Sequence, residues 1–264
     1  MTTSAPVPAL DRDLIARLRF DVIAASWTTD TLETLLSDGA LSALMRDSRL
    51  PALVELAGVT DPAATLTRFF VLGQPERASA LDASLPTLGA AGLETLGLAA
   101  TIDEAEATSA LVVTRGCGKF APKREDAQAG EGASSPKTPT LPTMHDPDEE
   151  APEPEVESDP WMSALYDLRP HAATLPGGDR DWWVTSDPGE MRTGKPLADD
   201  HVMGVGGATR TLLEMTVRDS VDSALDLGCG CGIQALYLAT HARRVVATDL
   251  SARACALTQF NAAL

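Results

Sequence analysis

The clearest chemical signal in the sequence is the segment from Asp226 to Gly232, which reads D-x-G-x-G-x-G. It follows residues 223–227, a short and mainly apolar run that predicts a strand. Residues 233–240 then predict a helix, and residues 245–248 predict a second buried strand that ends at Asp249. Glycine has no Cβ, so the backbone can turn tightly and approach a ligand closely. This order of elements predicts a nucleotide-type site beyond the carboxyl ends of two parallel strands.

The spacing of the glycines indicates which ligand fits. A dinucleotide site has G-x-G-x-x-G, but here the last position of that pattern is Ile233. No Gly-Lys-Ser/Thr follows, which excludes a P-loop. S-adenosylmethionine has no phosphate but carries a sulfonium, an ammonium group and a ribose. Asp226 could serve the positive end directly or through water, and Asp249 could accept hydrogen bonds from both ribose hydroxyls. The pattern therefore predicts S-adenosylmethionine as the cofactor.

Residues 224–236 (ALDLGCGCGIQAL), 246–251 (VATDLS) and 261–264 (NAAL) resemble class I S-adenosylmethionine-dependent methyltransferases. The similarity is greatest to the small-domain group, which includes HemK-like protein-glutamine enzymes and ribosomal RNA guanine enzymes. Residues 201–209 (HVMGVGGAT) resemble the segment that leads into that domain in a bacterial subgroup with a helical N-terminal region. The resemblance covers residues 161–264, and the N-terminal part only in general character. It implies a protein or RNA methyl acceptor. The predicted cofactor-binding residues are Asp226, Gly228, Cys229, Gly230, Gly232, Asp249 and Leu250.

The catalytic Asn/Asp-Pro-Pro-Tyr motif of that family is absent from the sequence. Asp187-Pro188-Gly189 lacks the second proline and the aromatic residue, so we interpret it as a turn. Only 32 residues follow Gly232, enough for one more strand and helix. We therefore expect the first half of a doubly wound sheet, a chain that is apparently truncated, and no methyl transfer by this chain alone. The catalytic residues stay unknown.

Composition and charge narrow the class of protein. The net charge is −17, and no basic stripe suggests phosphate contacts with nucleic acid. Aromatic residues make up 4% of the chain, so the core must consist mainly of Ala, Leu and Val. There is no signal-peptide pattern and no apolar run long enough to span a membrane, so we expect a cytoplasmic protein. Cys229 and Cys231 form C-x-C without a second pair, which argues against a metal site.

The chain divides into four predicted parts. Residues 1–115 have a helical pattern, and we expect four to six short helices between Asp11 and Gly97. Residues 116–160 hold eight of the eighteen prolines and a net charge of −7, which predicts a disordered acidic insertion. Residues 161–200 form a β-hairpin and connecting region. Residues 201–264 form the first part of the methyltransferase domain.

Several local predictions concern the connecting segments. Residues 109–114 (SALVVT) are rich in β-branched side chains and predict a strand. Residues 162–168 and 182–186 predict a hairpin, in which Trp182 and Trp183 point to opposite faces. One of them would belong to the core, and the other could serve a substrate. His201 could help to shape the cofactor pocket, although a surface position is the simpler interpretation.

The fold class predicted from these observations is α/β. It combines an N-terminal helical region with the first half of a Rossmann-like sheet. The helices followed by a hairpin could form a winged-helix-like arrangement, or the hairpin strands could merely cap the catalytic domain. The leading hypothesis for function is an enzyme that methylates a nitrogen of a protein glutamine or an RNA base. Two alternatives remain: a non-catalytic binding module and a winged-helix-like nucleic-acid-binding protein. The sequence does not predict the oligomeric state.

Overall fold

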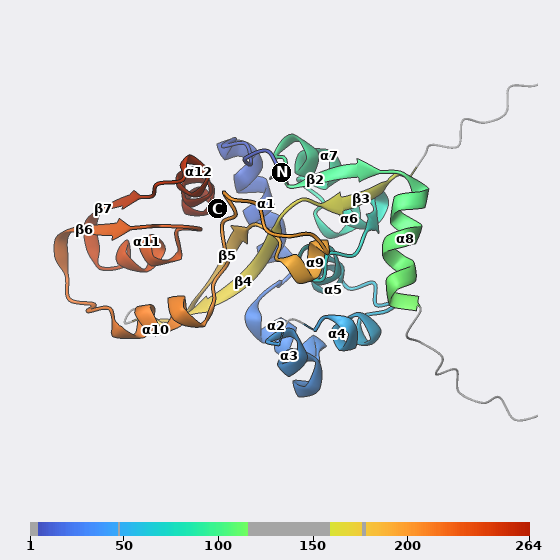
Figure 1. Cartoon of the computed structure of the whole chain (residues 1–264), viewed down its shortest axis with the longest axis horizontal. Coiled ribbons are helices and arrows are strands. Elements are labelled where there is room, and N and C mark those ends of the chain that lie inside the picture. Colours follow the sequence, from blue (N-terminus) through green and yellow to red (C-terminus); the bar gives the residue numbers. More distant parts are fainter. Residues whose placement is uncertain (1–4, 47, 116–158, 176–177) are drawn as a thin grey trace, which may run out of the picture.

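The structure, a computed structural model, describes residues 5–46, 48–115, 159–175 and 178–264 (Figure 1). The predicted disordered insertion lies outside these residues except for Asp159 and Pro160, and so does Cys117. Within the described part no helix is long and apolar enough to cross a membrane.

Short helices make up most of the N-terminal region. Their ends follow local signals: Asp61 accepts hydrogen bonds from the backbone of Ala63 and Ala64, Pro62 is the first helical residue, and Gly73 turns the chain at φ +65°. There are more helices than the four to six expected, and Thr28, Ser37 and Asp61 cap the starts of three of them. They are α1 (Arg12–Ala24), α2 (Thr29–Leu35), α3 (Asp38–Leu44), α4 (Leu50–Glu55), α5 (Pro62–Leu66), the π-helix η1 (Thr67–Val71), α6 (Ala78–Ser84), α7 (Gly89–Thr95) and α8 (Glu104–Arg115).

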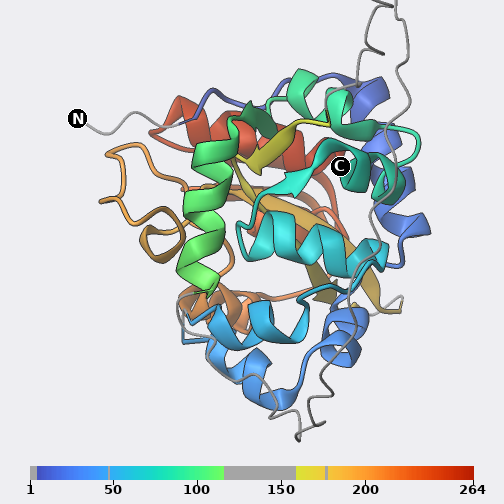
Figure 2. The same cartoon turned by 90° about the vertical axis from the view of Figure 1, so that its right-hand side faces the viewer.

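The predicted strand at residues 109–114 is wrong. These residues form the second half of α8, which begins after Asp103, whose carboxylate accepts a hydrogen bond from the Glu106 N–H at 2.7 Å. The capped start and the acidic first turn favour a helix over the β-branched composition of its end. Figure 2 shows α8 on the side of the molecule away from β6 and β7.

The first sheet joins residues from both sides of the predicted insertion. Its order is β1-β3-β2, and both pairings are antiparallel. The single strand predicted at residues 162–168 is in fact two strands that belong to different sheets, because the chain bends at Leu165 and Tyr166. The strands of the first sheet are β1 (Glu76–Arg77), β2 (Ala99–Ile102) and β3 (Trp161–Ala164).

The second sheet is a hairpin, as predicted, although its first strand shares only residues 167 and 168 with the strand predicted at residues 162–168. β4 (Asp167–Ala173) pairs antiparallel with β5 (Arg180–Ser186), with Asp167 opposite Ser186. Trp183 is buried and Trp182 is half-buried, packed edge-on against Tyr237 at 4.9 Å between ring centroids. The two tryptophans therefore face different neighbours, as the strand period requires.

The third sheet is parallel and carries the glycine-rich segment. β6 (Val221–Leu227) leads through α11 (Ile233–Leu238) to β7 (Ala242–Thr248), and α12 (Ala252–Ala263) follows. The predicted order of strand, turn, helix, strand and helix is confirmed. Two further helices, α9 (Glu190–Thr193) and α10 (Gly207–Met215), connect β5 to β6. The described residues thus form a mixed α/β structure; neither a complete doubly wound sheet nor a winged helix is established by it.

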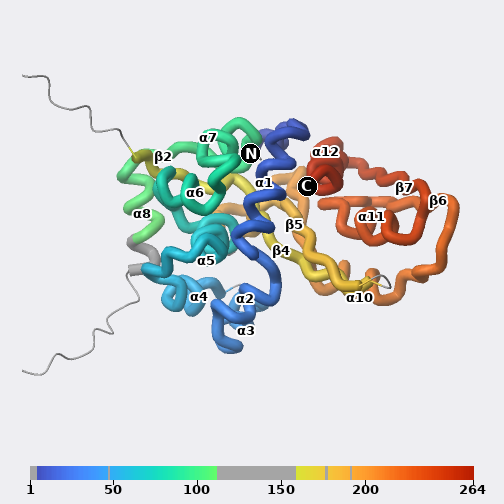
Figure 3. The backbone as a smooth tube through the Cα atoms, turned by 180° about the vertical axis from the view of Figure 1, so that it is seen from behind, coloured from blue at the N-terminus to red at the C-terminus, as the bar shows by residue number. Residues whose placement is uncertain are grey.

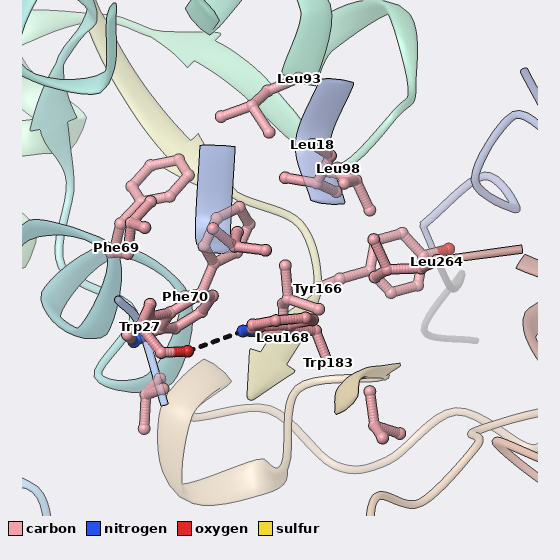
Figure 4. Packing of buried hydrophobic residues seen from close by; sticks show 14 of the residues in the cluster. Leu18, Trp27, Phe69, Phe70, Leu93, Leu98, Tyr166, Leu168, Trp183 and Leu264 are labelled. Atoms are coloured by element: carbon pink, nitrogen blue, oxygen red, sulfur yellow. Dashed lines mark hydrogen bonds between the residues drawn. The ribbon is translucent and has the colours of Figure 1, made fainter. Parts of the chain in front are cut away.

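One hydrophobic core joins the N-terminal helices to the hairpin and to α12. Trp27, Phe69, Phe70 and Tyr166 are fully buried in it, and most of its other members are Leu, Ala and Val, as expected from the composition. Figure 4 shows the indole nitrogen of Trp183 donating to the carbonyl oxygen of Trp27 at 2.8 Å. The β4–β5 hairpin lies between the N-terminal helices and the β6–α11–β7 segment (Figures 1 and 3).

Candidate functional site

In the segment between β6 and α11, every second residue is a glycine with a left-handed backbone conformation. Gly228, Gly230 and Gly232 have φ values of +80°, +54° and +85°, which L side chains rarely adopt. The N–H groups of Gly228 and Cys229 both donate to the carbonyl oxygen of Thr248, at 2.8 and 3.0 Å. The end of β7 therefore holds the glycine loop, defined here as residues 228–232.

The three glycines differ in what surrounds them. A Cβ atom on Gly228 or Gly230 would meet nothing within 4 Å, so this part of the backbone faces open space. A Cβ atom on Gly232 would lie 2.8 Å from Thr258 Cγ2 and 3.0 Å from Thr258 Cα. Gly232 therefore permits the close approach of α12, and the other two glycines leave room beside the loop.

The open side of the glycine loop forms one wall of a cleft of about 460 Å³, which we call the loop cleft. A second wall consists of residues 199–204 and the first turns of α10. Five of the seven residues predicted to bind the cofactor line it: Asp226, Gly228, Cys229, Gly230 and Asp249. Gly232 packs against α12 instead, and Leu250 is fully exposed beside the cleft without lining it.

Asp226 brings a buried carboxylate to this cleft. Only 7% of its surface is exposed, and its Oδ2 atom is buried without a hydrogen-bond partner. Burial raises the pKa of the Asp226 carboxyl, and the nearby charge of Asp249 raises it further, whereas a hydrogen bond from the Ala235 backbone opposes the shift. A buried carboxylate oxygen without a partner is costly, so it favours a donor or a positive charge in the cleft.

Asp249 lies at the end of β7 in a different environment. Its Oδ1 accepts a hydrogen bond from Ser251 N–H at 2.9 Å and its Oδ2 accepts one from Gly230 N–H at 3.0 Å. These two backbone hydrogen bonds lower the pKa of the Asp249 carboxyl. Each carboxylate oxygen can accept a further hydrogen bond. Asp249 therefore supports the loop and keeps acceptor capacity next to the cleft.

The two cysteines of the glycine loop are buried and have no disulfide. Burial raises the pKa of the Cys229 and Cys231 thiols, which keeps them protonated at neutral pH. Among the described residues, no group of three or more His, Cys, Asp and Glu side chains is placed to hold a metal ion.

Helix α12 packs against the glycine loop through Thr258. Ser251 caps the helix by accepting from the Ala254 N–H at 3.3 Å. About two turns later the hydroxyl of Thr258 donates to the carbonyl oxygen of Gly230 at 3.1 Å. The position of the loop is therefore set by this helix as well as by β7.

Sequence reasoning missed two residues beside the cleft, Asp187 and Arg253. Asp187 was interpreted as part of a turn, but it is 7% exposed and forms a two-pronged ion pair with Arg253 of α12. An acid directly after the predicted strand at residues 182–186 was the available signal, because the partner is 66 residues away in the sequence. His201 is half-buried and lines the cleft, whereas Trp182 lines a separate hollow beside Arg218.

Comparison with known proteins bears on the N-terminal region alone. Residues 24–111 match the model of a family described as a domain of unknown function (DUF7059). This match begins at the end of α1 and ends within α8, so it does not include the loop cleft. No curated protein matches the chain.

Proposed function

We propose that the loop cleft binds S-adenosylmethionine and that the chain is part of a methyltransferase. One observation carries the proposal: Asp226 and Asp249, from the ends of two neighbouring parallel strands, line the same cleft together with left-handed glycines. Ligands of open α/β sheets bind beyond the carboxyl ends of the strands.

The residues present fit the chemical groups of this cofactor. The unpartnered oxygen of Asp226 suits a positively charged group, which S-adenosylmethionine supplies in its sulfonium and ammonium groups. The open space beside Gly228 and Gly230 would be filled by a side chain at either position and is available to a ligand instead. Asp249 would accept hydrogen bonds from the ribose hydroxyls, for which its oxygens retain capacity.

When bound, the cofactor would supply an electrophilic methyl group for direct transfer to a nucleophile. The contribution of this chain would be to bind and orient the cofactor, because positioning supplies most of the rate enhancement in such a displacement. The acceptor that we propose is a nitrogen of a protein glutamine or of an RNA base. The net charge of −17 favours a protein over RNA, since phosphates would be repelled.

Calorimetric titration of the 264-residue chain with S-adenosylhomocysteine, the demethylated product, tests the proposal. We expect binding by the wild type and, for Asp249→Ala, a dissociation constant higher by about tenfold or more, since two hydrogen bonds to the ribose are lost. Asp222→Ala is the matched control, because Asp222 lies in β6 but is exposed and does not line the cleft. Absence of binding by the wild type, or equal affinity of Asp249→Ala and wild type, would contradict the proposal.

A further inference from the structure

We infer that Asp187 is a positioning residue for the loop cleft: held by Arg253, its carboxylate fixes residues 199–204, which line the cleft together with the glycine loop. The consequence for cofactor affinity rests on the function proposed above. The inference that Asp187 holds residues 199–204 in place does not depend on that function.

Asp187 forms hydrogen bonds with both backbone polar groups of Val202. The Asp187 N–H donates to the Val202 carbonyl oxygen at 3.0 Å, and the Val202 N–H donates to Asp187 Oδ2 at 2.8 Å. Val202 is 3% exposed and lines the cleft. Since one residue satisfies both polar backbone groups of Val202, movement of this wall would leave buried groups unpaired.

Arg253 in turn determines where the carboxylate of Asp187 lies. Its Nε donates to Asp187 Oδ2 at 3.0 Å and its Nη2 donates to Oδ1, and each side chain is 6% exposed. The guanidinium also donates to the Tyr166 hydroxyl at 2.8 Å and to the carbonyl oxygen of Ala5. This two-pronged geometry is specific to arginine and leaves Asp187 no freedom to release Val202.

A second contact brings the same wall against β5. Gly204 lies so close to the end of that strand that a Cβ atom would be 2.8 Å from Ser186 Oγ. Gly204 also lines the cleft. The wall is therefore docked at two points, Val202 on Asp187 and Gly204 on Ser186, and these anchors are consecutive residues at the end of β5.

The two walls of the cleft share one support. Helix α12 carries Arg253, which holds the second wall through Asp187, and Thr258, which bonds to Gly230 in the glycine loop at 3.1 Å. Helix α12 therefore contributes to the position of both parts of the cleft lining, together with β7 and the end of β5. Loss of the hydrogen bond between Asp187 and Val202 would loosen residues 199–204 and leave the glycine loop in place.

Asp187→Asn in the full chain tests this inference with two independent readouts. The amide nitrogen of asparagine cannot accept a hydrogen bond. Arg253 Nη2 loses its acceptor if the amide oxygen takes the place of Oδ2, and both Val202 N–H and Arg253 Nε lose theirs if it takes the place of Oδ1; in either case the charge that holds Arg253 is gone. We expect hydrogen exchange at the amides of residues 199–204 to be faster by about tenfold or more, and the dissociation constant of S-adenosylhomocysteine to rise by about tenfold. Asp222→Asn, in the exposed pair with Arg243, should change neither.

The outcomes separate the two proposals. Unchanged exchange in residues 199–204 would overturn the positioning role, and so would faster exchange with unaltered cofactor affinity. If the wild type itself does not bind S-adenosylhomocysteine, the proposed function fails, and the exchange measurement still decides whether Asp187 holds the wall.

A second pair of variants tests the docking without changing a buried charge, and it replaces Asp187→Asn if that variant does not fold. Gly204→Ala should push the wall away from Ser186, increase exchange and weaken binding several-fold. Ser186→Ala removes the oxygen that the new methyl group would meet. The double variant should therefore regain most of the lost affinity, and a double variant as weak as Gly204→Ala would contradict docking at this point.

Discussion

The side chain of Asn261 in α12 donates a hydrogen bond to the carbonyl oxygen of Cys231 in the glycine loop at 2.7 Å. The same amide donates to the carbonyl oxygen of Thr185 and accepts from its N–H, both at 2.8 Å. Asn261 is 3% exposed. One buried amide thus connects the last helix, the central hairpin and the loop that lines the cleft.

Asn261→Ala should lower the free energy of unfolding by about 3 kcal/mol, because three buried backbone groups lose their partner. Urea denaturation monitored by tryptophan fluorescence measures this change. Gln259→Ala is the matched control, since Gln259 is an exposed amide of the same helix and should cost less than about 0.5 kcal/mol. A similar loss in both variants would show that the three hydrogen bonds of Asn261 contribute little.

Alanine at three left-handed glycines should separate backbone strain from packing and from binding. Gly58 and Gly228 have φ values of +76° and +80° with open space around each, so alanine at either should cost about 1–2 kcal/mol of stability. Gly232→Ala should cost about 3 kcal/mol or more, since its methyl group also meets Thr258.

Calorimetry on the same variants adds the functional comparison. Gly228→Ala should weaken S-adenosylhomocysteine binding, because its methyl group would occupy the cleft, whereas Gly58→Ala should bind as the wild type does. Equal affinities for these two variants would mean that the space beside Gly228 is not used by the ligand.

Asp226→Asn should stabilise the unliganded chain while weakening cofactor binding. The pKa of Asp226 is raised in the folded state, mainly by burial, so its ionisation at neutral pH opposes folding. Removing the charge should add up to about 1 kcal/mol near pH 7, a modest gain because the hydrogen bond from the Ala235 backbone already offsets part of the cost of burying the charge.

The gain from Asp226→Asn should depend on pH in a defined direction. As the pH falls through the raised folded-state pKa, the wild-type carboxyl takes up its proton, and the advantage should vanish below about pH 4, where the carboxyl is neutral in the unfolded chain too. Thermal melts of both proteins from pH 4 to pH 8 measure the difference. A gain that grows towards acid pH would be inconsistent with a destabilising charge at Asp226.

The sequence by itself determined the local features of the cleft. The turns at Gly228, Gly230 and Gly232, the cap at Ser251 and the two parallel strands could all be predicted, because left-handed glycines, N-caps and apolar runs depend on residues a few positions apart. The wrong strand at residues 109–114 came from the same local reasoning. Asp103, which lies before these residues, caps a helix that continues through them.

Only the tertiary structure decided how the cleft is supported. No local pattern distinguishes Asp187 and Arg253 from surface charges, since their burial exists only after β5 and α12 have packed together. The same holds for Gly232, which was expected to line the ligand and instead accommodates Thr258. Long-range pairs depend on which elements meet, and that is a property of the packed core rather than of the sequence around each residue.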